Sequence, residues 1–314
     1  MNGVKETEAE RVTRQARSVL NSNGFSLQYS VIEELKKSSQ QWLFYGSEIP
    51  VTPRGKNTHI DCVFQDRSGS FFLIGECKRV QAGYADWVFV KTPLSSRKDT
   101  YCHLTLDELR ESRNSHASVV KKRIGPCSYA VTEDVYGLGF RTKRSLPPGA
   151  VECQDSVNVI NNCIEQVLRS TSGFINLLSH IFRPNNEVQY DYRYFFLPVI
   201  FTTAELWISE VNIAGADLET GNLAKVDEAR KVPLVWFNYN RPRELSPNFR
   251  DFEYYINQPN AVQTQSPTDR VLTEVADYGT YGFEYEEFTR SILIINTLAL
   301  TELENINRDY FRIQ

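Results

Sequence analysis

The sequence lacks any apolar run long enough to cross a lipid bilayer. Its longest apolar runs, 195–201 and 292–295, fall far short of the roughly 20 residues that a membrane-spanning helix needs. The first residues of the chain also contain no apolar signal region, so we do not expect secretion. These two absences predict a protein without a membrane partner.

Paired cysteines are missing as well. The six cysteines are scattered and form no C-x-x-C pair, which argues against a zinc knuckle and against a disulfide framework. Reduced thiols and a cytoplasmic location are the expectation that follows. The sequence also has no Gly-rich phosphate loop, no serine or cysteine triad and no internal repeat, so these common signatures give no lead to function.

A strongly basic composition is the third absence, because the net charge of the 314 residues is −4. The charge is nevertheless uneven along the chain. Residues 79–150 carry 12 basic and 7 acidic side chains, whereas residues 151–314 carry 13 basic and 23 acidic ones. Phosphate binding needs a local basic surface, not a basic whole chain, so a nucleic acid would lie along residues 79–150. On charge alone, a solvated basic face is the simpler interpretation.

Apolar residues make up 41% of the chain, and 16 Tyr and 18 Phe supply bulky side chains for a sizeable core. The mixture of elements predicts an α/β fold, with a mixed central sheet and helices on both of its faces. Periodicity and end signals predict helices over 5–20, about 30–39 (opened by a Ser30–Glu33 capping box), 105–122, 155–182 and 285–306, and strands over 41–52, 58–65, 70–80, 87–90, 194–202, 205–211 and 232–239.

The order of these elements suggests how the chain is divided. We interpret residues 1–205 as a core that is interrupted by an insertion at about 81–150. Residues 206–314 form an acidic C-terminal extension in this interpretation, with strands followed by a long helix that packs on the core.

Two apolar strands around a turn carry the most informative residues. The segment 66–70 is a turn signal, with Ser68-Gly69 at its tip. With those two residues as the loop, the numbers of cross-strand partners sum to 137, so Asp61 lies opposite Glu76 on the same face. Lys78 follows Glu76 by two residues and shares that face. A bulged three-residue loop would shift the register by one residue.

The remainder of both strands is apolar, which is typical of strands covered on both faces. Two carboxylates held about 5 Å apart in a low dielectric repel each other, and one protonates unless positive charge intervenes. Lys78 supplies one such charge, and a divalent cation such as Mg²⁺ supplies two and prefers oxygen ligands. Asp61, Glu76 and Lys78 therefore suit a metal-assisted hydrolytic site. The alternative is an exposed charge cluster where the strands leave the core.

These residues resemble the core of the PD-(D/E)xK nuclease superfamily, which has the restriction-endonuclease-like fold. Asp61 corresponds to the first acid and Glu76-Cys77-Lys78 to the (D/E)-x-K element, while Ile60 stands where the name-giving proline would be. The order of elements over roughly residues 1–205 also matches the αβββαβ arrangement of that fold.

The resemblance implies specific roles. Asp61, Glu76 and the backbone carbonyl of Cys77 would bind Mg²⁺, for which Mn²⁺ substitutes, and Lys78 would activate or orient the attacking water. Glu48, one strand away, is a further candidate catalytic acid, although a surface glutamate beside a turn explains it equally well. Simpler explanations as capping or solvated residues apply to the other candidates, namely Glu33, Glu34, His59, Gln166, residues 121–123, Arg141, Lys143 and Arg144.

The function implied by the resemblance is a metal-dependent phosphodiesterase that acts on nucleic acid, DNA rather than RNA. An endonuclease role in prokaryotic restriction or anti-phage defence follows from the habits of the family. The acidic residues 151–314 would pack the fold, form a homodimer or meet a partner protein. Two alternatives stay open: a catalytically inactive nuclease-like fold that serves as a binding module, and a metal-dependent hydrolase of small nucleotides.

Overall fold

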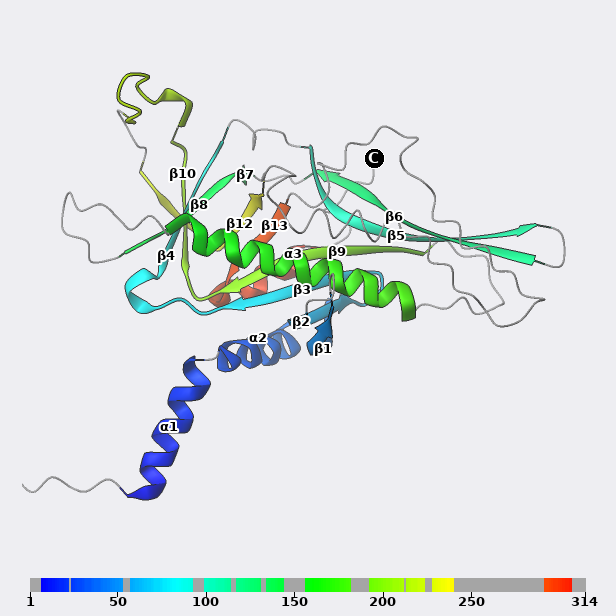
Figure 1. Ribbon diagram of the computed structural model, residues 1–314, viewed down its shortest axis with the longest axis horizontal. Coiled ribbons are helices and arrows are strands. Elements are labelled where there is room, and N and C mark those ends of the chain that lie inside the picture. The colour runs from blue at the N-terminus through cyan, green and yellow to red at the C-terminus, as the bar shows by residue number, and fades with distance from the viewer. Residues whose placement is uncertain are drawn as a thin grey trace, which may run out of the picture.

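The computed structural model describes residues 7–22, 24–52, 57–92, 99–113, 117–130, 134–143, 156–181, 192–211, 213–223, 228–239 and 291–306. Within these ranges the protein is an α/β structure with a nine-stranded mixed sheet and a second sheet of four strands (Figure 1). Helices lie on both faces of the large sheet. The fold class predicted from the sequence is therefore confirmed at this level. No helix in the described ranges is both long enough and apolar enough to cross a bilayer.

The large sheet begins with an antiparallel meander of β1 (Trp42–Val51), β2 (Thr58–Asp66) and β3 (Phe71–Lys78). Cys62 lies opposite Gly75 and Phe64 opposite Leu73, so the predicted register is confirmed. The connecting turn has four residues instead of the expected two. Because both loops are centred on the same position, the longer turn leaves the pairing unchanged.

The turn itself is set by Asp66 and Gly69. The Gly69 N–H donates to the Asp66 carbonyl at 2.9 Å, and Gly69 has a φ of 75°, a left-handed conformation that costs glycine little. The Asp66 carboxylate accepts hydrogen bonds from the backbone N–H groups of Ser70 and Phe71, each at 3.0 Å. An aspartate at the first turn position thus closes the loop with its side chain.

The centre of the sheet is parallel. Helix α3 (Ser156–Ile181) precedes β9 (Tyr192–Thr202), which pairs in parallel with β3. Beyond β9 the strand order continues through β13 (Ser291–Asn296), β12 (Leu234–Asn238) and β7 (Val135–Tyr136). Strands β9 and β13 are covered on both faces, which explains their nearly continuous apolar sequences.

Two helical layers enclose the large sheet. Helix α2 (Phe25–Ser38) and the 3₁₀ helix η7 (Thr297–Asn305) pack on one face, where the Trp42 indole donates to the Leu303 carbonyl at 3.0 Å. Helix α3 covers the other face with Ile160, Ile164, Val167, Phe174 and Leu178. Helix α1 (Glu8–Ser22) extends away from the sheet (Figure 1).

A second sheet lies beside the first and has the order β11 (Arg230–Val232), β10 (Glu205–Ser209), β4 (Asp86–Val90) and β8 (Leu138–Thr142). A short 3₁₀ helix, η2 (Ala82–Tyr84), joins β3 to β4. The strands predicted near residues 87–90, 205–211 and 232–239 are thereby confirmed. Their apolar residues complete the core under α3.

Three predicted helices are wrong in whole or in part. Residues 105–113 and 117–122 lie in the paired strands β5 (Asp99–Arg113) and β6 (Ala117–Ala130), because residues 105–108 pair with the start of β9 and a partner strand overrides local helix propensity. The expected long C-terminal helix is β13 followed by η7, and its part before residue 291 lies outside the described residues. Four consecutive large apolar residues, 292–295, suit a strand buried on both faces better than a helical stripe.

The predicted capping box at Ser30 is the third error. Helix α2 begins five residues earlier, after Gly24, which has a φ of 75°. The Ser30 hydroxyl donates to the Ser26 carbonyl at 2.7 Å inside the helix. The division into a 1–205 core and a 206–314 extension stays a prediction, and β12 and β13 of the second part are members of the large sheet.

Gly75 permits the close approach of three sheet strands. A methyl group placed there would meet the Cys62 Sγ at 2.5 Å and the Phe201 ring at 2.6 Å. We expect Gly75→Ala to lower the free energy of unfolding by about 2 kcal/mol, because overpacking forces buried neighbours off their rotamers. Urea denaturation measures the change. Gly83→Ala is the matched control, since its Cβ would meet no atom within 4 Å, and equal losses in the two variants would contradict the packing argument.

Candidate functional site

Three acidic residues lie on three adjacent strands at one end of the meander. The register places Asp61 of β2 opposite Glu76 of β3, one step beyond the pair of Cys62 and Gly75. Glu48 of β1 lies between residues paired with Cys62 and Ile60, and therefore across from Asp61. Neighbouring strands are about 4.8 Å apart, so the hairpin brings together the acids that the sequence singled out. Their chemical roles stay predictions.

Glu76 is the most deeply buried of the three, with only 1% of its surface exposed. Its Oε1 forms an ion pair with the Lys78 Nζ at 2.7 Å. Its Oε2 is buried and has no hydrogen-bond partner among the described residues. A buried carboxylate oxygen without a partner costs free energy, so this atom requires a proton or a cation.

The electrostatic surroundings confirm this requirement. Burial and, to a smaller extent, the charge of Asp61 raise the pKa of Glu76 from its ordinary value of 4.5 to about 7, against the opposing effect of Lys78. Burial also raises the pKa of Asp61, although its Oδ2 accepts a hydrogen bond from the Cys77 backbone N–H at 2.7 Å. Two carboxylates in a dry site therefore compete for one stabilising charge.

Lys78 occupies the centre of the polar contacts. Its Nζ contacts the Glu76 Oε1 and donates to the Gln166 Oε1 at 2.9 Å. Burial by itself lowers the pKa of Lys78, but the ion pair with Glu76 outweighs it and leaves the pKa raised. The side chain is 28% exposed, so the ammonium is charged, held on two sides and still accessible.

Two glutamines support the site from the helical layers. Gln166 of α3 holds Lys78, although the sequence suggested only a helix-surface residue. Its neighbours Cys163 and Val167 are buried, so Gln166 lies at the margin of the buried stripe, a signal that the sequence did contain. Gln28 of α2 is 3% exposed, and its Nε2 donates to the Asp61 backbone carbonyl at 2.7 Å. Nothing in the sequence indicated Gln28.

Glu48 has an unusual backbone. Its φ of 50° is left-handed, and it is the only residue other than glycine with a positive φ in the described part of the chain. The pairing of β1 with β2 shifts between Phe44 and Gly46, a few residues before it. Such conformations cost roughly 1–3 kcal/mol and are concentrated at functional sites. The charge of Glu48 also raises the pKa of both Asp61 and Glu76.

The other predicted residues whose side chains are described, namely Glu33, Glu34, His59, Arg141 and Lys143, make no contact with this cluster in the described part of the chain. Glu33 forms an exposed ion pair with Lys36 at 3.1 Å, and His59 is exposed. The side chains of residues 121–123, like the whole of Arg144, lie outside the described residues. Arg141 and Lys143 contact the ring of Tyr84.

The thiols near the acids are buried packing groups. Cys62, Cys77 and Cys163 are free and buried. A hydrogen bond with Cys62, together with burial, holds the pKa of Cys77 well above its ordinary value, and burial raises the pKa of Cys163 to about 11. Nucleophilic chemistry needs a thiolate, which the surroundings of Cys77 and Cys163 disfavour.

The donor set fits a hard divalent cation with few protein ligands. No cluster of three or more His, Cys, Asp or Glu side chains suited to a metal occurs in the described ranges. The predicted set is smaller, with two carboxylates and the Cys77 carbonyl, and Mg²⁺ needs only one or two carboxylates because it retains several waters. The unpartnered Oε2 of Glu76, beside the negative charge of Asp61, is the observation that favours such an ion. Comparison of the chain with family models, curated proteins and solved structures finds no match.

The raised pKa of Glu76 predicts a pH dependence of stability in EDTA. The folded-state pKa of about 7 exceeds the ordinary 4.5, so folding binds a proton between these values. The contribution of Glu76 to the free energy of unfolding is complete below about pH 4.5 and is lost as the pH rises through 7, a fall of about 3 kcal/mol. Urea denaturation from pH 5 to 8 measures this fall. We expect a much flatter profile in Glu76→Gln, and identical profiles would contradict the assignment.

Proposed function

We propose that this chain is a Mg²⁺-dependent nuclease that hydrolyses phosphodiester bonds of nucleic acid. The observation that carries the proposal is the buried Glu76, which has one oxygen on Lys78 and the other unpartnered beside Asp61. A structural ion pair would satisfy both oxygens, whereas a site that accepts a cation leaves one available. Lys78, whose side chain is 28% exposed, lies on the same face, where a phosphate can approach it.

The topology supports the resemblance to the PD-(D/E)xK superfamily. Helix α2 precedes the β1–β2–β3 meander, and α3 then leads to β9 in parallel with β3. This is the αβββαβ order that the resemblance implies for the fold, and the acids lie on its second and third strands. The substrate proposed on this basis is DNA, cut by an endonuclease of restriction or anti-phage defence.

The residues of the site take distinct roles in this proposal. Asp61, Glu76 and the Cys77 carbonyl would hold Mg²⁺, which supplies Lewis-acid activation of water and neutralises charge on the phosphate. Lys78 orients the attacking water and stabilises the negative charge that develops on the phosphoryl oxygens. Gln166 fixes the Lys78 ammonium, and Glu48 adds negative charge that strengthens the attraction for a cation.

The test is a cleavage assay with plasmid DNA, linear DNA and RNA in Mg²⁺, Mn²⁺ or EDTA. We expect cleavage only with a divalent ion, and a loss of at least about 100-fold in Asp61→Asn, Glu76→Gln and Lys78→Met, since each removes a charge needed in the transition state. Glu34→Gln, an exposed acid on α2, is the matched control and keeps full activity.

Two outcomes of this assay would reject the proposal. Metal-dependent cleavage that persists in all three variants would place the active site elsewhere. Absence of cleavage of every polymer, with the variants and the wild type alike, would reject nuclease activity altogether. Parallel thermal melts show whether each variant is folded before its activity is compared.

Gln166 allows a second prediction, as a positioning residue. Gln166→Met has a similar shape but accepts no hydrogen bond from Lys78. We expect kcat to fall about 10-fold, because a hydrogen bond to a charged group is worth roughly 1.5–3 kcal/mol, while KM changes little. Steady-state kinetics measures this split, with Asn158→Met on the exposed face of α3 as control. A rise in KM at constant kcat would instead place Gln166 in contact with the substrate.

A further inference from the structure

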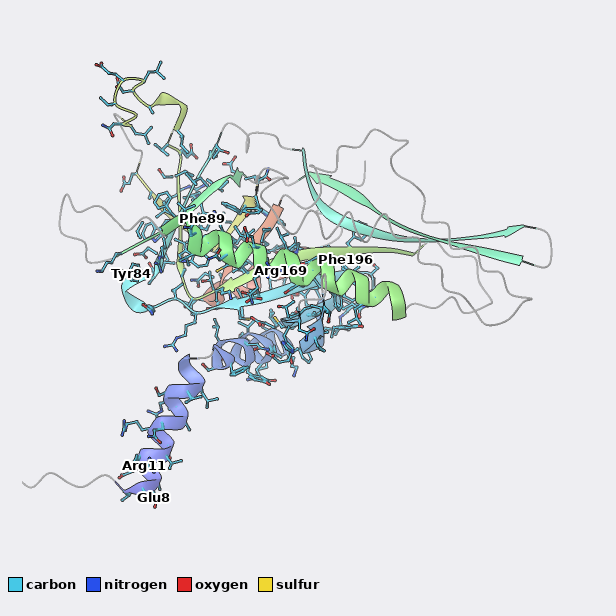
Figure 2. All side chains as sticks on the ribbon, in the orientation of Figure 1. Glu8, Arg11, Tyr84, Phe89, Arg169 and Phe196 are labelled. Carbon is cyan, nitrogen blue, oxygen red and sulfur yellow. The ribbon has the colours of Figure 1, made fainter. Side chains whose placement is uncertain are left out.

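A basic and aromatic cluster lies just beyond the candidate site, and we call it the Tyr84 cluster. Figure 2 shows Tyr84 on the turn that joins β3 to β4. The Arg141 guanidinium lies over its ring, 4.5 Å from the centroid, and the Lys143 Nζ lies 5.9 Å from the same centroid. Lys143 is exposed, whereas Tyr84 and Arg141 are half-buried. One ring thus orients two cations.

Neither cation of the cluster has an acidic partner among the described residues. Other lysines of the protein do have one. Lys36 lies 4.5 Å from the centroid of the Phe44 ring but is paired with Glu33, and Lys91 is paired with Asp134 at 3.0 Å. Two positive charges held close together without compensation form a site that attracts an anion.

Asp86 on β4, the strand that pairs with β8, does not neutralise the cluster. Asp86 lies directly opposite Thr142 and so points to the face of the sheet away from Arg141, its neighbour in sequence. The Trp207 Nε1 donates to the Asp86 Oδ1 at 3.3 Å. The charge of the cluster therefore remains available to a ligand.

The fold keeps the cluster close to the candidate site. Tyr84 follows Lys78 by six residues, so their Cα atoms are at most about 20 Å apart. Helix α3 contacts both regions: the backbone of Gly139 packs near the Ile160 side chain, and Gln166 binds Lys78. Ile160 and Gln166 are separated by only about 9 Å along the axis of α3.

We infer that Tyr84, Arg141 and Lys143 form a phosphate-binding subsite for the nucleic-acid backbone, within about six nucleotides of the bond that is cut at a spacing of roughly 3.4 Å per nucleotide. The inference rests on the proposed function. It adds that the substrate runs from the hairpin acids across the turn after β3 toward β8. Because the guanidinium already covers one face of the ring, the subsite reads charge and shape and not base sequence.

The experiment is a binding titration in EDTA, where a metal-dependent nuclease does not cut its ligand. Fluorescence anisotropy with a labelled 20-base-pair duplex is recorded at several salt concentrations for wild type, Arg141→Gln/Lys143→Gln and Lys36→Gln/Lys37→Gln. The control pair removes the same charge from α2, which packs on the face of the large sheet away from α3, and one of its lysines also lies over a ring. We expect affinity to fall at least tenfold in the first double variant and less than twofold in the control.

The salt dependence gives a sharper test. Loss of two phosphate contacts reduces the slope of log K against log salt by about 1.8, since each contact on duplex DNA contributes about 0.9. Tyr84→Phe keeps the ring and binds as wild type, whereas Tyr84→Leu loses the orientation of both cations and binds more weakly. If the double variant is unfolded in a thermal melt, Lys143→Gln alone replaces it, with half of the slope change expected.

Failure of the inference and failure of the proposed function are separable. Equal affinities and slopes in the cluster variant and the control would overturn the subsite even if the wild type cuts DNA. Absence of duplex binding by the wild type would also overturn it. A cluster-dependent loss of binding in a protein that cuts no polymer would support the subsite and reject the nuclease.

Discussion

The half-satisfied carboxylate of Glu76 is the constraint on which the rest of the site depends. One oxygen binds Lys78, and the other is buried without a partner in a site where the charge of Asp61 also acts. Lys78 cannot compensate both acids, because a third acid, Glu48, adds to the same negative field. The folded chain therefore keeps an excess of negative charge at the site, which a proton or a cation neutralises.

The fold holds the residues of the site in the positions that produce this excess of negative charge. Strand β3 is paired with β2 up to Gly75 and with β9 along its whole length, so the backbone that carries Glu76 is fixed in the sheet. Helix α3 closes the face above it and delivers Gln166 to Lys78, while α2 delivers Gln28 to the backbone of Asp61. Each layer of the fold contributes one side-chain amide to the site, and neither amide neutralises charge. The two glutamines fix the geometry of the site, and the remaining negative charge is left for a ligand to neutralise.

The sequence was most informative about structure that depends on residues close together in the chain. The turn residues and the two-residue period of a strand were sufficient to place Asp61 opposite Glu76, and this pairing survived a misjudged loop length because the centre of the turn was right. Long-range pairing was not accessible in the same way. The sequence of residues 105–122 is typical of a helix, and the pairing of 105–108 with β9 cannot be read from it. Residues 292–295 are likewise identified as a strand only once their two neighbouring strands are known. Gln166 was undervalued for the same reason, since its partner is 88 positions away in the chain.

The irregular backbone of β1 has a consequence for the behaviour of the protein in a crowded solution. Within the described residues β1 terminates the large sheet, and a straight terminal strand offers unpaired amides and carbonyls to any passing chain. The register shift after Phe44 and the left-handed Glu48 bend this rim, and Pro50 removes one donor from it. The distortion that places Glu48 beside the hairpin thus also disfavours self-association of the protein by strand addition at the β1 edge.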